Sequence, residues 1–180
     1  MPNAISWINS LGDVNLHWVE EPTNPDDVVG HAAIAKAIAP VRVATGEHVA
    51  NRIIFKQMLQ SKSLSFLQID ASRVAGINEN IAIILMAAKY EIPVCPHAGG
   101  VGLCEMVQHL AMFDFVAIGG EHPDRVVEFV DHLHEHFVVP TDIQHARYMP
   151  PLAAGAGAEM FAQSVADFTF PSGKEWQAVS

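Results

Sequence analysis

The sequence predicts an α/β fold, a partial (β/α) TIM barrel of about five parallel βα units followed by an irregular C-terminal tail. Two observations lead to this prediction. Five short apolar runs end in an acidic residue or a histidine, and segments with helical periodicity separate them. A (β/α) barrel builds its active site from groups at the carboxyl ends of its strands, so a series of such runs is typical of this fold. The runs read HWVEE, VRVATGE, SFLQID, IPVCPH and FDFVAIGGE.

The length of the chain limits how much of a barrel it can form. The chain has 180 residues, 50% of them hydrophobic, and its mean hydropathy is +0.20, which suits a buried parallel sheet covered by helices. A complete eight-stranded barrel typically needs about 250 residues. We therefore expect residues 1–139 to form the C-terminal part of a barrel. From Pro140 onward prolines and glycines interrupt the pattern, so residues 140–180 are expected to form an irregular tail.

The expected strands and helices alternate along the chain, which implies parallel βαβ units. Strands are expected at residues 16–19, 41–44, 65–69, 93–95 and 113–118. Helices are expected at residues 3–11, 24–40, 50–60, 80–90, 103–110 and 124–136. The second of these begins at Asn24-Pro25-Asp26-Asp27, where Asn suits the N-cap, Pro the first helical position and the acids the first turn.

Charge and cysteine content narrow the possible partners and compartment. The formal net charge is −10 and no basic stripe occurs, which argues against a nucleic-acid partner. An acidic site suits a divalent cation, although a solvated acidic surface also explains the charge. Cys95 and Cys104 form neither a CxxC pair nor a disulfide framework, which indicates a reducing compartment. With no signal peptide or membrane-spanning run recognised, the expected location is cytoplasmic.

Glu20 and Glu47 are the candidate metal ligands because they end adjacent predicted strands. Neighbouring strands lie about 5 Å apart, so the two carboxylates repel each other unless a cation lies between them. Mg²⁺ takes carboxylate and water ligands, and two carboxylates alone make a weak site, so a third ligand is expected. The alternative is that both are solvated loop acids. Glu21 either contacts a metal ligand without binding the metal itself or is simply solvated.

Asp70 and His97 are the candidate proton-transfer pair because they end the next two strands. A carboxylate that accepts a hydrogen bond from an imidazole fixes the tautomer of the ring and raises its basicity. The alternative is an N-cap aspartate and a loop histidine. A rival metal cluster is His132, His134 and His136, which we interpret instead as a helix end favoured by the helix dipole.

Four segments, in the order WVEEPT, ATGEH, QIDASRVAGINE and CPHAGGVGLCE, resemble the C-terminal half of an enolase-superfamily (mandelate racemase-like) barrel. Within that superfamily the chain is most similar to the L-fuconate dehydratase group, which includes mitochondrial enolase-like relatives. The segments VDHLHEHFVVP and YMPP add to the similarity, which runs from about residue 14 to residue 175.

The resemblance implies roles for individual residues. Glu20 and Glu47 match two of three Mg²⁺ ligands, Asp70 and His97 match an Asp-His dyad, and His48 and Glu121 are expected to contact the substrate. In similar dehydratases a base removes the proton alpha to the carboxylate of an acid sugar, and Mg²⁺ stabilises the enediolate. The histidine then protonates the departing 3-hydroxyl, and the product tautomerises to a 2-keto-3-deoxy acid.

The resemblance also implies that the chain is a fragment covering barrel strands four to eight. The lysine base, the third metal ligand (an aspartate) and the N-terminal capping domain of the family lie on earlier segments, and residues 140–180 would pack on that domain. We expect a chain that is incomplete as a standalone enzyme and that forms a homo-oligomer or joins a complementary N-terminal half. The alternative is a non-catalytic remnant or split subunit that acts through a partner chain. By resemblance, a mitochondrial location is also possible.

Overall fold

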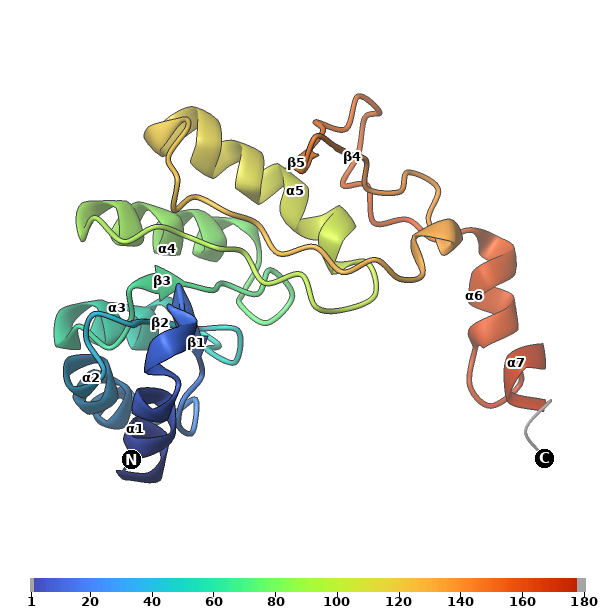
Figure 1. Cartoon of the computed structure of the whole chain (residues 1–180). Helices are drawn as coiled ribbons and strands as arrows, with labels where there is room; N and C mark the ends of the chain where they lie inside the picture. Colours follow the sequence, from blue (N-terminus) through green and yellow to red (C-terminus); the bar gives the residue numbers. More distant parts are fainter. Residues whose placement is uncertain (1, 178–180) are drawn as a thin grey trace. The chain divides into compact units, whose positions relative to one another are not determined.

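A parallel sheet organises the first part of the chain in this computed structural model, which describes residues 2–177 (Figure 1). The strands β1 (Trp18–Glu20), β2 (Arg42–Thr45) and β3 (Phe66–Leu67) lie side by side in that order. Parallel pairing aligns Trp18 with Arg42 and Ala44 with Phe66. Beyond β3, single parallel bridges join Leu67 to Val94 and Asp70 to His97. The predicted α/β fold with parallel strands is therefore confirmed.

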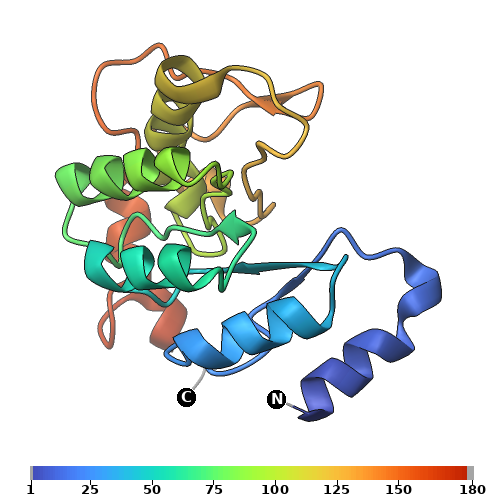
Figure 2. The same cartoon turned by 90° about the vertical axis from the view of Figure 1, so that its left-hand side faces the viewer.

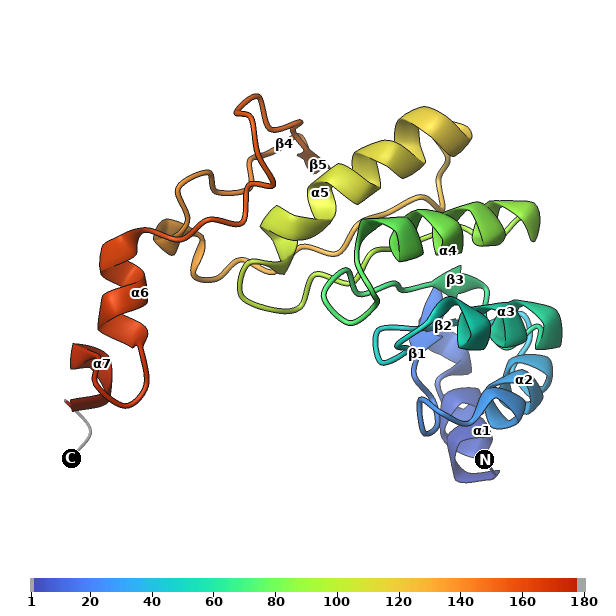
Figure 3. The ribbon, with the colours of Figure 1, turned by 180° about the vertical axis from the view of Figure 1, so that it is seen from behind.

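Helices that follow the strands pack beside one another in chain order. Figures 2 and 3 show the second, third and fourth helices side by side along the sheet. The second helix is capped by Asp27, whose side chain accepts a hydrogen bond from the Gly30 N–H, whereas Asn24 accepts one from the Asp26 N–H in the preceding turn. The elements of this region are α1 (Pro2–Ser10), η1 (Gly12–Val14), α2 (Val28–Ala37), α3 (Arg52–Ser61) and α4 (Ile77–Lys89).

The main core lies between the helices α3 and α4 and the strand residues beneath them. Phe55 and Met58 of α3 are fully buried, as are Ile83 and Ile84 of α4, and they belong to the same apolar cluster as Leu67 of β3. Burying each side chain of this kind stabilises the fold by about 1.5–3 kcal/mol. This packing holds the strands in place, and with them the residues that follow each strand.

The strand expected at residues 113–118 is wrong, because this segment is helical. α5 (Leu103–Asp114) continues directly into a π-helical turn, η2 (Phe115–Gly119). No turn residue separates the two, and the pair Gly119-Gly120 comes only at the end of η2. Val116 is 80% exposed, so the apolar run is not a buried strand. A short apolar run fits a strand and a helix equally well, and here the helix that precedes it decides the outcome.

The helix expected at residues 124–136 is also wrong. Residues 125–131 carry no helix, and Figure 1 shows them as an extended trace. The Glu128 N–H donates to the Pro96 carbonyl at 3.3 Å, so this segment runs beside the residues that precede His97. The β-branched side chains of Val126, Val127 and Val130 favour an extended backbone. Only a short 3-10 turn, η3 (His134–His136), follows them.

The chain divides into two compact units, which we describe separately. Unit 1 contains the residues up to His97 together with residues 110–128. Unit 2 contains residues 98–109 together with the residues from Phe129 onward. Within unit 2 a small antiparallel hairpin and two short helices interrupt an otherwise irregular course; they are β4 (Ile143–Gln144), β5 (Arg147–Tyr148), α6 (Ala162–Phe168) and α7 (Lys174–Gln177). Among the helices of residues 2–177, none has the length and apolar character needed to cross a bilayer.

A buried ion pair between Glu105 and His134 holds unit 2 together. The Glu105 side chain is fully buried, and its Oε1 accepts hydrogen bonds from His134 Nδ1 at 2.6 Å and from the Thr141 N–H at 3.1 Å. His134 Nε2 lies 2.9 Å from the Val130 carbonyl oxygen. Because a carboxylate and a carbonyl can only accept, both ring nitrogens donate, and the imidazole is therefore protonated.

The two pKa shifts of this pair agree with that assignment. Burial alone would raise the pKa of Glu105, but the hydrogen bonds from His134 and Thr141 outweigh it and lower the pKa. Burial alone would lower the pKa of His134, but its hydrogen bonds to Glu105 and Val130 outweigh it and raise the pKa. Each partner thus stabilises the charged form of the other.

We expect the Glu105→Gln variant to lose about 2 kcal/mol of stability, because a charge-assisted buried hydrogen bond is lost. The raised pKa of His134 makes its contribution fully present below the ordinary value of 6.5 and lost as the pH rises through the folded value. The lowered pKa of Glu105 makes its contribution fully present above the ordinary value of 4.5 and lost as the pH falls through the folded value. Thermal unfolding should therefore show the largest gap between wild type and variant between these two pH values. Glu135→Gln, at a side chain that is 70% exposed, serves as control; equal melting temperatures for all three proteins across this range would refute the pair's role.

Candidate active site

The carboxyl ends of the strands in unit 1 gather the four residues that the sequence predicts for metal binding and proton transfer. Glu20 ends β1, and Glu47 follows the end of β2 by two residues. Asp70 and His97 face each other across a parallel bridge. Parallel strands present their carboxyl ends at the same edge of a sheet, so these four residues share that edge. The structure therefore places Glu20, Glu47, Asp70 and His97 together.

Asp70 and His97 form the expected hydrogen-bonded pair. His97 Nδ1 lies 3.1 Å from Asp70 Oδ2, and the Asp70 side chain is only 6% exposed. The other oxygen, Oδ1, accepts from the N–H and the hydroxyl of Ser72, both at 2.7 Å, and from the Arg73 N–H at 3.2 Å. A carboxylate can only accept, so His97 donates from Nδ1 and turns Nε2 toward the site.

The charge of Asp70 is secured by these contacts. Burial acts to raise its pKa, but the two hydrogen bonds from Ser72 and the contact with His97 outweigh burial, so that the pKa is lowered. The group therefore stays ionised at neutral pH. The ionised carboxylate accepts from Nδ1 and so fixes the orientation of the His97 ring, with Nε2 directed toward the strand edge.

Two carboxylates face His97 Nε2. Glu47 Oε2 lies 3.3 Å away and Glu128 Oε2 lies 3.8 Å away. Glu128 was not predicted, because the segment that carries it reads as a helix. The β-branched residues Val126, Val127 and Val130 around it are the one sequence signal for an extended segment, but they fit one face of a helix equally well. Glu121, which was expected to contact the substrate, is exposed and follows Gly120 at the end of the helical turn η2 rather than a strand.

Glu20 and Glu21 both lie near enough to Glu47 for their negative charges to raise its pKa. Glu20 Oε2 accepts a hydrogen bond from Gln68 Nε2 at 2.8 Å, whereas Glu21 receives His48 Nδ1 at 2.9 and 3.0 Å from its two oxygens. Successive side chains of a strand point to opposite faces. Glu21 departs from strand geometry, with a left-handed φ of 41°, so the alternation of β1 ends at Glu20.

The neighbours of Glu47 make its ionised form costly. Burial raises its pKa most, and the charges of Glu21 and Glu20 raise it further, while His97 and His48 act in the opposite direction. The net result is a raised pKa. A divalent cation would relieve this repulsion, and Mg²⁺ prefers carboxylate oxygens. The donor set of this edge therefore fits Mg²⁺.

One group of possible ligand atoms stands out among residues 2–177. Glu21, Glu47 and His48 each offer one ligand atom, and these atoms lie within 4.8 Å of one another. The rival histidine cluster does not form such a group, because the expected helix over its residues is absent. His134 binds Glu105, and His136 Nδ1 lies 3.0 Å from the Ser164 hydroxyl oxygen in unit 2.

Cys95, which lies just before this edge, is not a nucleophile. Burial, followed by the charges of Glu128 and Glu20, raises the pKa of its thiol to about 12. The thiol therefore stays protonated, in agreement with a role in packing.

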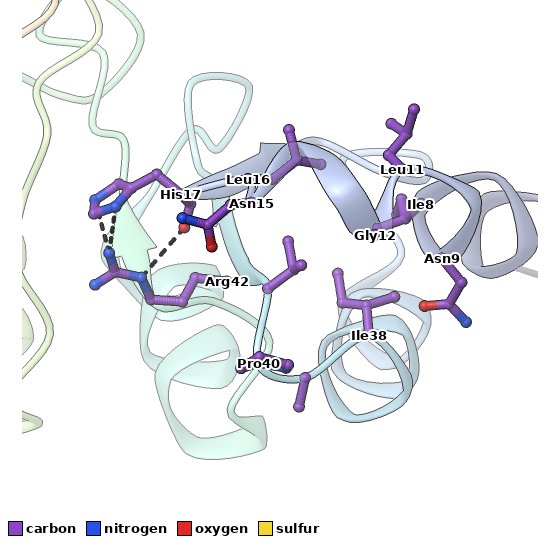
Figure 4. A pocket seen from close by; sticks show the side chains of 12 residues that line it. Ile8, Asn9, Leu11, Gly12, Asn15, Leu16, His17, Ile38, Pro40 and Arg42 are labelled. Carbon is purple, nitrogen blue, oxygen red and sulfur yellow. Dashed lines mark hydrogen bonds between the residues drawn. The ribbon is translucent and has the colours of Figure 1, made fainter.

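A cavity of about 450 Å³ lies elsewhere in unit 1, as Figure 4 shows. It is lined by the end of α1, the residues before β1, the turn between α2 and β2, and Arg42 at the start of β2, which donates hydrogen bonds to His17. Both strands begin at this end, so the cavity lies at their amino ends and apart from the carboxyl-end cluster.

Known proteins resemble this chain over nearly its whole length. The crystal structure of human mitochondrial enolase superfamily member 1 is 52% identical with a TM-score of 0.96, covering 99% of this chain and 41% of that one. The crystal structure of L-talarate dehydratase from Polaromonas sp. JS666, complexed with Mg and L-glucarate, is 26% identical with a TM-score of 0.75, covering 90% of this chain and 42% of that one.

The L-galactonate dehydratase of Hypocrea jecorina is 44% identical over 97% of this chain and 39% of its own length. The chain thus spans about two fifths of the length of the curated relatives that it matches. A model of the family described as enolase C-terminal domain-like matches residues 1–164. This match covers most of the chain, and the parallel strands of the chain, with acids at their carboxyl ends, agree with the match. The chain therefore belongs to the enolase C-terminal domain-like family.

Proposed function

We propose that this chain supplies the C-terminal part of the active site of a Mg²⁺-dependent acid-sugar dehydratase. One observation carries the proposal: His97 is held by Asp70 through Nδ1 and presents Nε2 to Glu47 and Glu128. Such a ring is placed to exchange a proton beside a cluster of carboxylates. Relatives named as dehydratases of L-galactonate and L-talarate support the reaction class. L-Fuconate or a similar acid sugar is the proposed substrate.

Glu20 and Glu47 are the proposed Mg²⁺ ligands of this chain. Both carry carboxylates at the same strand edge, and the pKa of Glu47 is raised by burial and by the neighbouring acids. The bound cation would supply positive charge that neutralises these acids and attracts the carboxylate of the substrate. Glu21 and His48 lie beside Glu47 and bond to each other, and we assign His48 to contact the bound acid sugar.

His97 is the proposed general acid of the reaction. Dehydration removes a proton from the carbon next to the carboxylate and a hydroxide from the following carbon, so one water leaves in total. His97 Nε2 would give its proton to the departing 3-hydroxyl as the carbon–oxygen bond breaks, and Asp70 would stabilise the ring before that transfer. The enol that remains tautomerises to the 2-keto-3-deoxy acid. We assign Glu128, in place of Glu121, to contact the substrate.

We assign no lysine of this chain as the base that removes the proton next to the substrate carboxylate. Lys36 lies on α2, Lys56 on α3, Lys89 on α4 and Lys174 on α7, and Lys62 directly follows α3. The strand edge with His97 contains none of these positions. A complementary segment that carries a base is therefore a proposed partner, and a homo-oligomer is a second possibility.

An alternative is a non-catalytic or split subunit that acts through a partner chain. The observation that favours it is the position of β1 at the edge of the sheet. Among the described residues, β1 pairs with β2 and with no other strand. A parallel strand left at an edge offers unpaired backbone groups to another chain. We propose a cytoplasmic or mitochondrial location, and the name of the human relative favours the second.

The Glu47→Gln variant should abolish Mg²⁺ binding, because it removes the carboxylate that faces both neighbouring acids. Wild type should bind Mg²⁺ weakly in isothermal titration calorimetry, since two carboxylates make a weak site. Glu91→Gln removes an exposed acid of unit 1 and should leave the affinity unchanged. Tight Mg²⁺ binding that survives Glu47→Gln would exclude this site.

The isolated 180-residue chain should not dehydrate L-fuconate measurably, because no lysine lies at the strand edge. Adding an N-terminal half from a related enzyme should restore turnover, followed as 2-keto acid formed. His97→Asn should then abolish turnover, because asparagine has no group at the position of Nε2. His109→Asn, at an exposed position of unit 2, should leave turnover unchanged. Substantial turnover by the isolated chain would contradict this account of the base.

A further inference from the structure

Gln68 is a buried polar side chain that the proposed reaction does not use. It follows β3 directly and is only 3% exposed. Its backbone is held firmly: the N–H donates to the Thr45 carbonyl at 3.0 Å, and the carbonyl oxygen lies so close to Gly46 that an added Cβ there would approach within 2.7 Å. The side chain therefore starts from a fixed point beside the strand edge of unit 1.

The hydrogen bond to Glu20 fixes the orientation of the Gln68 amide. Gln68 Nε2 lies 2.8 Å from Glu20 Oε2. A carboxylate can only accept, so the nitrogen must face it, and the reversed amide would oppose two oxygens. In this orientation Gln68 Oε1 is buried without a hydrogen-bond partner.

An unpartnered buried amide oxygen lowers the stability of the fold, and an apolar side chain of similar size would avoid that loss. Stability alone therefore does not explain a glutamine at this position. What the amide provides is a hydrogen-bond donor that fixes the position of Oε2 on the exposed residue Glu20. With Oε2 held by Gln68, the other carboxylate oxygen remains available for a cation.

We propose that Gln68 is a positioning residue that holds the Glu20 carboxylate in the orientation in which it binds the divalent cation. This inference rests on the proposed function, because it takes Glu20 to be a metal ligand. Groups that hydrogen-bond a metal ligand without touching the metal typically change metal affinity by about 10–100-fold. Gln68 belongs to that class of residue.

Gln68→Met tests this role, because it keeps the length of the side chain and removes the donor. Gln108→Met is the matched control: Gln108 is equally buried at 1% exposure, but its Nε2 donates to the Glu105 backbone carbonyl in unit 2. The probe is Mn²⁺, a hard cation that prefers the same oxygen ligands as Mg²⁺. Electron paramagnetic resonance of free Mn²⁺ measures the affinity of the full chain, and competition by Mg²⁺ shows that both ions share the site.

We expect Gln68→Met to weaken Mn²⁺ binding about 10-fold or more. Gln108→Met should leave the affinity unchanged, and the melting temperature of Gln68→Met should not fall below that of Gln108→Met. Glu20→Ala should weaken binding at least as much as Gln68→Met, because the action of Gln68 passes through Glu20. Gln68→Asn, which withdraws the amide by one methylene, should weaken binding as well and serves if the methionine variant does not fold.

The possible outcomes separate this inference from the function on which it rests. Wild-type affinity in Gln68→Met, with binding still lost in Glu47→Gln, overturns the role of Gln68 and leaves the metal site intact. A loss in Gln68→Met that exceeds the loss in Glu20→Ala also overturns it, because the effect would then bypass Glu20. If Glu47→Gln leaves Mn²⁺ binding unchanged, the proposed metal site itself fails, and the inference fails with it.

Discussion

The parallel alignment of the strands in unit 1 is the constraint on which the candidate site depends. Parallel strands bring their carboxyl ends to one edge. The bridge between Asp70 and His97 belongs to this alignment and sets the two side chains of the proposed proton-transfer pair opposite each other. The core between α3 and α4 holds this edge in place. Because the register of the strands decides which side chains face each other, a slip of one residue would separate the pair and turn both groups to opposite faces.

The site and the second unit use the same residue types for different purposes. At the strand edge Asp70 binds only one side of His97, and the other ring nitrogen faces the carboxylates of Glu47 and Glu128. In unit 2 Glu105 and the Val130 carbonyl bind both ring nitrogens of His134, which leaves that ring no free position for chemistry. A histidine that is bonded on both sides is fixed in its charged form and acts as a structural group, whereas a histidine with one exposed nitrogen can transfer a proton.

The sequence was informative where a strand ends in an ionisable residue, and less so where apolar residues fit two periodicities. Glu20, Glu47, Asp70 and His97 could be predicted because each follows a short apolar run bounded by turn residues. Glu128 could not be identified, because Val126, Val127 and Val130 fit one face of a helix as well as an extended segment. The run before Glu121 failed for the related reason that α5 continues into it without a break. The pairing of Glu21 with His48 depends on a left-handed backbone at Glu21, which the residue type does not indicate.

The central claim is that the strand edge of unit 1 binds a divalent cation beside His97, and paramagnetic broadening by Mn²⁺ tests it most directly. Nuclear magnetic resonance spectra of the full chain, recorded while Mn²⁺ is added in small amounts, locate the ion through the signals that disappear first. The account predicts that the His97 and His48 ring signals and the Glu47 backbone amide broaden before all others. Preferential broadening of the His132, His134 and His136 ring signals, with the strand edge unaffected, would contradict it.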